Sequence, residues 1–268
     1  MKVITAGKTD KGLKRKLNED SLLLADDLGL YVIADGMGGH KAGEIASKMV
    51  VETMADYWRR VKKNDPPSFL EKIPGDVSEN ARHLINSISL SNIIIHEAQK
   101  RPEYHRMGST VSALLIDEDC IWAGNVGDSP VFLFDQGRLI MVSEEHSVEA
   151  EKQKLGRDDA LSSDSPFLKN ILTRALGLNE KVKVFMTPIM PEPGDIILMC
   201  SDGLTNFVPV QSIKSVLSDD SLSPDQKVDL LINRANKEGG GDNISAIMLE
   251  VMKEGIWKKI KKNFLSKS

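Results

Sequence analysis

The feature of this sequence that most constrains its fold is an apolar segment that ends in Asp-Gly and occurs twice. LYVIADG ends in Asp35-Gly36, and IILMCSDG ends in Asp202-Gly203. Short apolar runs bounded by glycine are typical of buried β-strands. Each strand would carry one carboxylate to its end, and a rigid strand can hold that carboxylate at a fixed position.

Three further segments place acids beside predicted strands. Glu19 and Asp20 precede SLLLAD, Asp128 lies in AGNVGDSPVFLF, and Asp242 follows three glycines and precedes NISAIMLEV. A single Asp-Gly is a favoured turn and alone would indicate nothing more. Because the pattern recurs along the chain, we expect these acids to gather at one site.

Gathered carboxylates repel one another unless a cation neutralises them. Oxygen ligands without histidine or cysteine suit Mg²⁺ or Mn²⁺ better than zinc or copper. Gly36 has no Cβ, so its backbone carbonyl can approach such an ion closely. Two cations about 3.5–4 Å apart can activate a water molecule and clamp both oxygens of an in-line displacement. Hydrolysis of a phosphate ester is the reaction that benefits most.

Arg15, in KGLKRKLNED, lies just before the acids Glu19 and Asp20. A guanidinium can bind a phosphate through two parallel hydrogen bonds, which a lysine cannot do. A solvated surface charge is the alternative interpretation of this arginine.

Other phosphate and redox chemistries lack their motifs. Cys120 and Cys200 lie in apolar segments, and neither begins a phosphate loop that ends in arginine. A dinucleotide fingerprint fails because Lys41 occupies its third glycine position. The sequence contains no G-x-x-x-x-G-K-[ST] loop and no HExxH motif.

Predicted strands cluster in hairpins and predicted helices come in pairs, which favours an α+β sandwich over alternating βαβ units. Helical periodicity covers residues 40–60, 76–100, 210–217 and 225–236. Strand patterns cover residues 21–36, 110–117, 120–125, 130–135, 138–143, 195–203 and 243–251.

The 268 residues suit one large domain, and the net charge of −4 gives no reason to expect nucleic-acid binding. Two cysteines make no disulfide framework and indicate a reducing compartment. The apolar start of the chain is too short for a signal peptide. No apolar run approaches the roughly 18 residues of a membrane span. We therefore expect a cytoplasmic protein.

Residues 253–268 form a basic tail, in which Ile256, Trp257, Ile260 and Phe264 lie on one face of a predicted helix. We expect this face to pack on the domain, as terminal helices often do. Weak contact with a membrane surface or a partner is the alternative.

Taken together, these motifs resemble the metal-dependent serine/threonine protein phosphatases, the PPM family (type 2C), in its bacterial form. The resemblance runs from about Ala6 to Val251, and its elements occur in the family's order. They are GLKRKLNED, VIADGMGGHKAGEIAS, GSTVSALLI, AGNVGDSPVFLF, EEHSV, NILTRALG, CSDGLTNFV and GGGDNISAIMLEV.

The resemblance implies two antiparallel β-sheets flanked by helices on both outer faces, in a phosphatase domain of residues 1–252. Residues 143–178 would form a mobile flap beside the active site, where substrate choice is thought to reside. The implied activity is hydrolysis of phosphoserine and phosphothreonine in proteins by a metal-bound hydroxide, without a phosphoenzyme. The implied partners are phosphorylated proteins and a cognate serine/threonine kinase, and we expect a monomer.

The resemblance also assigns roles to the core residues. Asp35 would bridge two Mn²⁺ or Mg²⁺ ions and orient the attacking water, and the Gly36 carbonyl would ligate one of them. Asp202 and Asp242 would hold the other ion.

Around this core, Arg15 would bind the substrate phosphate, and Glu19 and Asp20 would support the metals directly or through water. Asp128 would help to hold a third, weaker metal ion. Pro130 stands where family members often have arginine, so the positive charge of that arginine is absent here.

The sequence leaves the proton donor for the leaving group unassigned, since Met37 stands where many eukaryotic members carry histidine. Metal-bound water is a plausible substitute. We expect His40 to be structural. His146 is balanced between packing in the flap and proton transfer, because histidine titrates near neutral pH.

Two other functions remain open from the sequence. A catalytically silent regulator could use the same fold to bind a phosphoprotein or kinase, although such proteins usually lose metal ligands and none of the core acids is missing here. A scaffold recruited through the basic tail is the other possibility.

Overall fold

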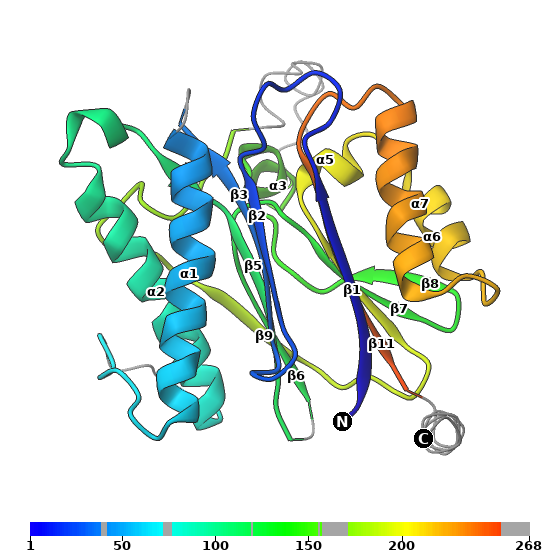
Figure 1. The fold of residues 1–268 in the computed structure, drawn as a ribbon, viewed down its shortest axis with the longest axis horizontal. Coiled ribbons are helices and arrows are strands. Elements are labelled where there is room, and N and C mark those ends of the chain that lie inside the picture. Colours follow the sequence, from blue (N-terminus) through cyan, green and yellow to red (C-terminus); the bar gives the residue numbers. More distant parts are fainter. Residues whose placement is uncertain (39–41, 72–76, 119, 155, 157–170, 253–268) are drawn as a thin grey trace, which may run out of the picture.

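The computed structural model describes residues 1–38, 42–71, 77–118, 120–154, 156 and 171–252. In these residues the strands form two antiparallel sheets packed face to face, with helices on both outer sides (Figure 1). This arrangement confirms the predicted αββα sandwich. The predicted tail helix of residues 253–268 lies outside the described residues, as do His40 and much of the predicted flap.

The first sheet has the strand order β1-β11-β10-β7-β8. Helices α6 and α7 cover its outer face, and the short helix α5 follows β10 directly (Figure 1). The elements are β1 (Val3–Asp10), β7 (Val131–Asp135), β8 (Arg138–Met141), β10 (Ile196–Cys200), β11 (Ile244–Val251), α5 (Asp202–Thr205), α6 (Val210–Leu217) and α7 (Pro224–Lys237).

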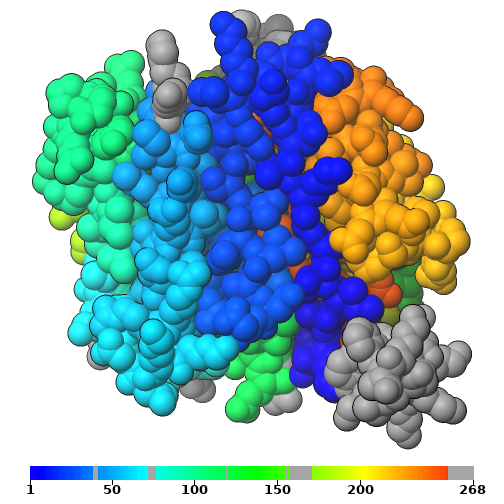
Figure 2. Space-filling model, viewed as in Figure 1, coloured from blue at the N-terminus to red at the C-terminus, as the bar shows by residue number. Residues whose placement is uncertain are grey.

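The second sheet has the order β2-β3-β5-β6-β9, with the short strand β4 paired to β3. Helices α1 and α2 cover its outer face. In the space-filling view, the blue surface of the first two strands separates these helices from α6 and α7 (Figure 2). The elements are β2 (Asp20–Ala25), β3 (Leu30–Met37), β4 (Gly108–Ser109), β5 (Val111–Ile116), β6 (Ile121–Val126), β9 (Phe185–Ile189), α1 (Ala42–Lys62) and α2 (Glu79–Ala98). A 3₁₀ turn, η1 (Pro102–Tyr104), and helix α3 (Val148–Lys154) complete the described elements.

Strand β3 is buried on both faces, which explains its continuous apolar run. Leu30 and Val32 pack against helices α1 and α2, whereas Tyr31 and Ile33 pack in the layer between the two sheets. Strand β10 repeats this alternation in the other sheet. Each fully buried large apolar side chain contributes about 1.5–3 kcal/mol, so these two strands hold the centre of the sandwich together.

The connection from β6 to β7 crosses between the sheets. Between residues 110 and 143 the sequence predicted four strands in antiparallel hairpins. In the structure these four strands form two hairpins, β5–β6 in the second sheet and β7–β8 in the first. The turn that contains Asp128 therefore joins the two halves of the sandwich.

Strands β1 and β9 were not predicted. Both lie at sheet edges, and β1 mixes polar with apolar residues. Strand β9 also contains Pro188, and proline within sheets is found mainly in edge strands. None of the helices in the described ranges is long and apolar enough to cross a membrane.

Candidate metal centre

The predicted site residues come together at one end of the sandwich, where α5 and the β1–β2 connection lie at the top of Figure 1. The ends of strands from both sheets deliver their acids there. A cavity of about 300 Å³ is lined by five acids, one arginine and Gly36 of the predicted set. These lining residues are Arg15, Glu19, Asp35, Gly36, Asp128, Asp202 and Asp242.

The backbone of Asp35 is fixed from strands β4 and β5. The Thr110 amide donates to the Asp35 carbonyl at 2.8 Å, and the Thr110 hydroxyl accepts from the Asp35 amide at 3.1 Å. The Ser109 hydroxyl also donates to the Asp35 carbonyl, at 3.1 Å. Strand β3 continues to Met37, so Asp35 lies near the end of the strand, as the sequence predicted. Its backbone is thus held by Ser109 and Thr110 on one side, and the residue pairs with Asp20 of strand β2 on the other.

Gly36 is required by the close approach of helix α1. A Cβ at this position would lie 2.0 Å from the Gly43 carbonyl oxygen, far inside van der Waals contact. A Cβ on Gly43 would in turn lie 2.4 Å from Glu19 Oε1. The two glycines therefore let the first turn of α1 pack directly against the acids.

Asp20 lies behind the cavity and not on its wall, because it is 6% exposed and does not line the cavity. Its Oδ2 accepts hydrogen bonds from Ser201 at 2.9 Å and Ser245 at 2.7 Å. Burial, reinforced by the charges of Asp202 and Asp242, raises the pKa of Asp20 to about 7 against the effect of these serines. Asp20 is therefore held behind the cavity wall by the hydroxyl groups of Ser201 and Ser245.

The acids of the cavity destabilise one another's ionised forms. Burial raises the pKa of Asp35 well above its usual range, and the charges of Asp20 and Asp202 raise it further. Burial and the charge of Asp202 raise the pKa of Asp128 to about 7. A cation among these groups would remove the repulsion.

The donor atoms fit a hard divalent cation. Glu19 Oε1 and Asp20 Oδ1 are buried without a hydrogen-bond partner in the described structure, and such oxygens are costly unless an ion or water meets them. Carboxylate and carbonyl oxygens are the ligands that Mg²⁺ and Mn²⁺ prefer. Among the described residues, no group of three or more acid, histidine or cysteine side chains has the spacing of a metal site.

Arg15 lies on the cavity wall and pairs with Asp242, with Nη2 2.8 Å from Oδ2. Arg15 lies in the connection between strands β1 and β2, and Asn243 holds the backbone of this connection in place. Its Nδ2 donates to the carbonyls of Lys11 and Leu17, and its Oδ1 accepts from the Glu19 amide at 2.8 Å. Sequence reasoning missed Asn243, although it directly follows Asp242 in the glycine-rich motif.

Of the two histidines considered as proton donors, His146 lies in the described part of the chain and His40 does not. Met37 stands where many eukaryotic family members carry histidine. Met37 lines the cavity. His146 does not line it and is fully buried, and its Nδ1 accepts the Gly127 amide at 3.0 Å. Burial lowers the pKa of His146 to about 4, so the ring is neutral at neutral pH. The structure therefore favours packing over proton transfer for His146.

Comparison with known proteins gives the same class. The profile of the family described as protein phosphatase 2C matches residues 13–246. The serine/threonine phosphatase stp of Listeria welshimeri is 33% identical over 254 residues, covering 91% of this chain and 94% of that protein. Protein phosphatase PhpP of Streptococcus pneumoniae is 29% identical over 250 residues, covering 92% and 96%.

Solved structures agree in fold. The serine/threonine phosphatase of S. agalactiae superposes with a TM-score of 0.81 at 32% identity, covering 93% of this chain and 100% of that one. The catalytic domain of the phosphatase PstP, solved in complex with two manganese ions, gives 0.74 at 27% identity, covering 94% and 99%.

Fold, acid cluster and matches together define a metal-dependent protein phosphatase. The chain belongs to the protein phosphatase 2C family, so the family predicted from the sequence is confirmed.

Proposed function

We propose that this protein hydrolyses phosphoserine and phosphothreonine in other proteins and counteracts a serine/threonine kinase. The observation that carries the proposal is the cavity in which five acids from both sheets meet beside Arg15. The relatives, serine/threonine phosphatases from Listeria and S. agalactiae, support the same activity.

Two divalent cations, Mn²⁺ or Mg²⁺, would be held by Asp35, the Gly36 carbonyl, Asp202 and Asp242. Glu19 and Asp20 would support them. When bound, such ions supply Lewis acidity, which lowers the pKa of a water molecule and neutralises charge on the phosphate.

The chain's own groups would position the reactants. The Asp35 carboxylate, fixed by the strand, would accept a hydrogen bond from the attacking water and orient it. Arg15 would leave Asp242 to bind two oxygens of the substrate phosphate. Asp128, on the same wall, would help to hold a third and weaker ion.

The remaining parts of the proposal concern the surroundings of this site. Residues 143–178 would act as a flap in the phosphatase domain of residues 1–252. The protein would act as a monomer in the cytoplasm, and the tail of residues 253–268 would dock on the domain. A silent regulator is less well supported, because every predicted core acid is present on or behind the cavity wall.

A phosphopeptide assay with metal titration tests the activity. The wild-type protein should release phosphate with Mn²⁺ and lose this activity in EDTA. Asp35→Asn and Asp202→Asn should each lower kcat by orders of magnitude while thermal unfolding shows an intact fold. Asp220→Asn, a change at an exposed acid, is the matched control and should keep full activity. Near wild-type activity of Asp35→Asn would reject the assigned site, and an inactive wild-type protein would favour the silent regulator.

A further inference from the structure

One wall of the cavity is apolar and has no part in the chemistry proposed above. Leu172 and Met37 are the long apolar side chains among the described residues that line the cavity. Leu172 is half-buried, and its neighbour Ile171 is 45% exposed. Neither carboxylates nor phosphate gain from an aliphatic neighbour, so these side chains offer a surface to another part of a substrate.

The backbone around Leu172 is tied down at two places. The Val148 amide donates to the Ile171 carbonyl at 2.9 Å, and the Thr173 amide donates to the His146 carbonyl at 2.9 Å. Leu172 itself pairs with Ser147 in an isolated β-bridge. This backbone pairing fixes the place at which the Leu172 side chain enters the cavity wall.

The other end of this segment, at Leu176, bonds to strand β4, which pairs with the strand that carries Asp35. Leu176 and Ser109 exchange two backbone hydrogen bonds, of 2.8 and 3.2 Å. The Ser109 hydroxyl also donates to the Asp35 carbonyl. Through Ser109, the backbone of residues 171–176 is therefore held at a fixed position relative to Asp35.

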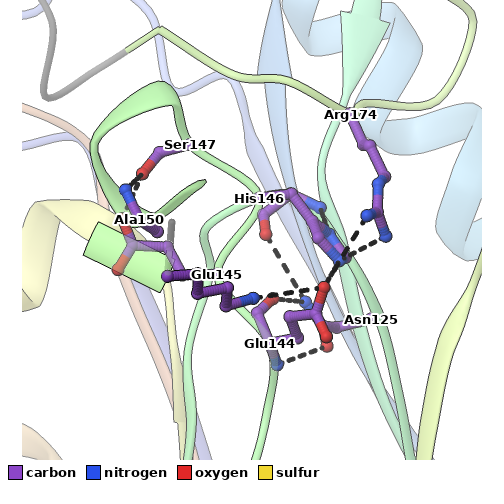
Figure 3. A network of polar contacts seen from close by, with 9 residues as sticks. Asn125, Glu144, Glu145, His146, Ser147, Ala150 and Arg174 are labelled. Atoms are coloured by element: carbon purple, nitrogen blue, oxygen red, sulfur yellow. Dashed lines mark hydrogen bonds and ion pairs between the residues drawn. The ribbon is translucent and has the colours of Figure 1, made fainter. Parts of the chain in front are cut away.

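A polar cluster of Glu144, His146 and Arg174 lies beside this segment (Figure 3). Arg174 Nη1 lies 2.9 Å from His146 Nε2, and Arg174 Nη2 lies 3.7 Å from Glu144 Oε1. Lys154 Nζ lies 3.3 Å from the same Glu144 oxygen. His146 also exchanges hydrogen bonds with Gly127, through its amide and its Nδ1. Arg174 thus connects the segment of Leu172 to the turn of Asp128.

From this geometry we infer that Leu172 contacts the peptide around the phosphorylated residue and that Arg174 is a positioning residue for Leu172. The inference rests on the proposed function. Arg15 and the cations held by the acids would bind the phosphate, which every substrate carries. The apolar wall would bind the peptide, which only protein substrates carry.

The test compares two substrates, a phosphopeptide and p-nitrophenyl phosphate, with Mn²⁺ present. Leu172→Ala and Arg174→Ala should each lower kcat/KM for the phosphopeptide about tenfold, mainly through KM, because an apolar contact is lost. With p-nitrophenyl phosphate, kcat/KM should stay within about twofold of wild type. Arg174→Lys should recover part of the phosphopeptide activity, since a lysine keeps a positive charge near Glu144. Arg138→Ala is the matched control, because Arg138 is exposed and pairs with Asp135 within the β7–β8 hairpin, which does not contain Leu172 or Arg174.

The outcomes separate the inference from the proposed function. An equal loss with both substrates, or no loss with either, overturns the inference while the phosphatase activity stands. A wild-type protein that is inactive on both substrates overturns the proposed function. Thermal unfolding shows whether Arg174→Ala is folded, and Leu172→Ala carries the test if it is not.

Discussion

Replacing Asp128 with asparagine should stabilise the metal-free protein, by an amount that grows with pH. The pKa of Asp128 is raised from its usual 3.8 to about 7 by burial and by the charge of Asp202. Between these two pH values the folded state binds more protons than the unfolded state, so ionisation of Asp128 weakens folding as pH rises through this window. Asparagine has nearly the same shape and no charge, and it removes this cost.

The size of the effect follows from the shift. About three pKa units at 1.36 kcal/mol each give a cost of up to about 4 kcal/mol at pH 8, where the folded carboxyl is ionised. At pH 5 the folded Asp128 is protonated while the unfolded one is mostly ionised. The cost is then only about 1–2 kcal/mol. Asp128→Asn should therefore gain more stability at pH 8 than at pH 5.

Urea denaturation in EDTA at pH 5, 6.5 and 8 measures these free energies of unfolding. Asp220→Asn serves as the control, because this exposed acid should change stability by no more than about 0.5 kcal/mol. A loss of stability in Asp128→Asn, or an equal gain at pH 5 and pH 8, would refute the argument that burial and charge repulsion of Asp128 lower the free energy of unfolding of the metal-free protein.

Three further predictions concern the same cavity. Arg15→Ala should raise KM for a phosphopeptide more than it lowers kcat in steady-state assays, because Arg15 would bind phosphate in the ground state; a pure kcat effect would contradict this role. Gly36→Ala would place a Cβ 2.0 Å from the Gly43 carbonyl oxygen, so thermal unfolding should show a loss of at least about 1–3 kcal/mol, and an unchanged midpoint would show that α1 can move away. Mn²⁺ at about 100 times its Kd should stabilise the wild-type protein by about 2.7 kcal/mol in a thermal scan, and Asp202→Asn should gain much less.

The sequence predicted the central strands and the meeting of the acids, because both depend on local patterns. Strands β3 and β10 are apolar throughout since both of their faces are buried. Asp35 and Asp202 follow from the Asp-Gly motif at the ends of those runs. The edge strands β1 and β9 could not be predicted in this way, because β1 mixes polar with apolar residues and β9 is short and contains Pro188.

The supports of the acids could not be predicted in this way. Ser201 and Ser245 meet Asp20 from positions 181 and 225 residues away, and neither serine belongs to a pattern that indicates a hydrogen bond to a buried acid. The amide of Asn243 likewise reaches Lys11 across 232 residues. Contacts of this kind arise only when segments far apart in the chain have paired or packed.

The chain crosses from one sheet to the other at Asp128, and this division of the site between two sheets has a consequence for unfolding. Asp35 belongs to the second sheet, whereas Asp202 and Asp242 lie at strand ends of the first sheet. Neither sheet alone therefore provides all of the proposed ligands. An ion held by all three acids would link the two sheets. The ion would bind with its full set of ligands only after the sheets have packed together, and separation of the sheets would release it.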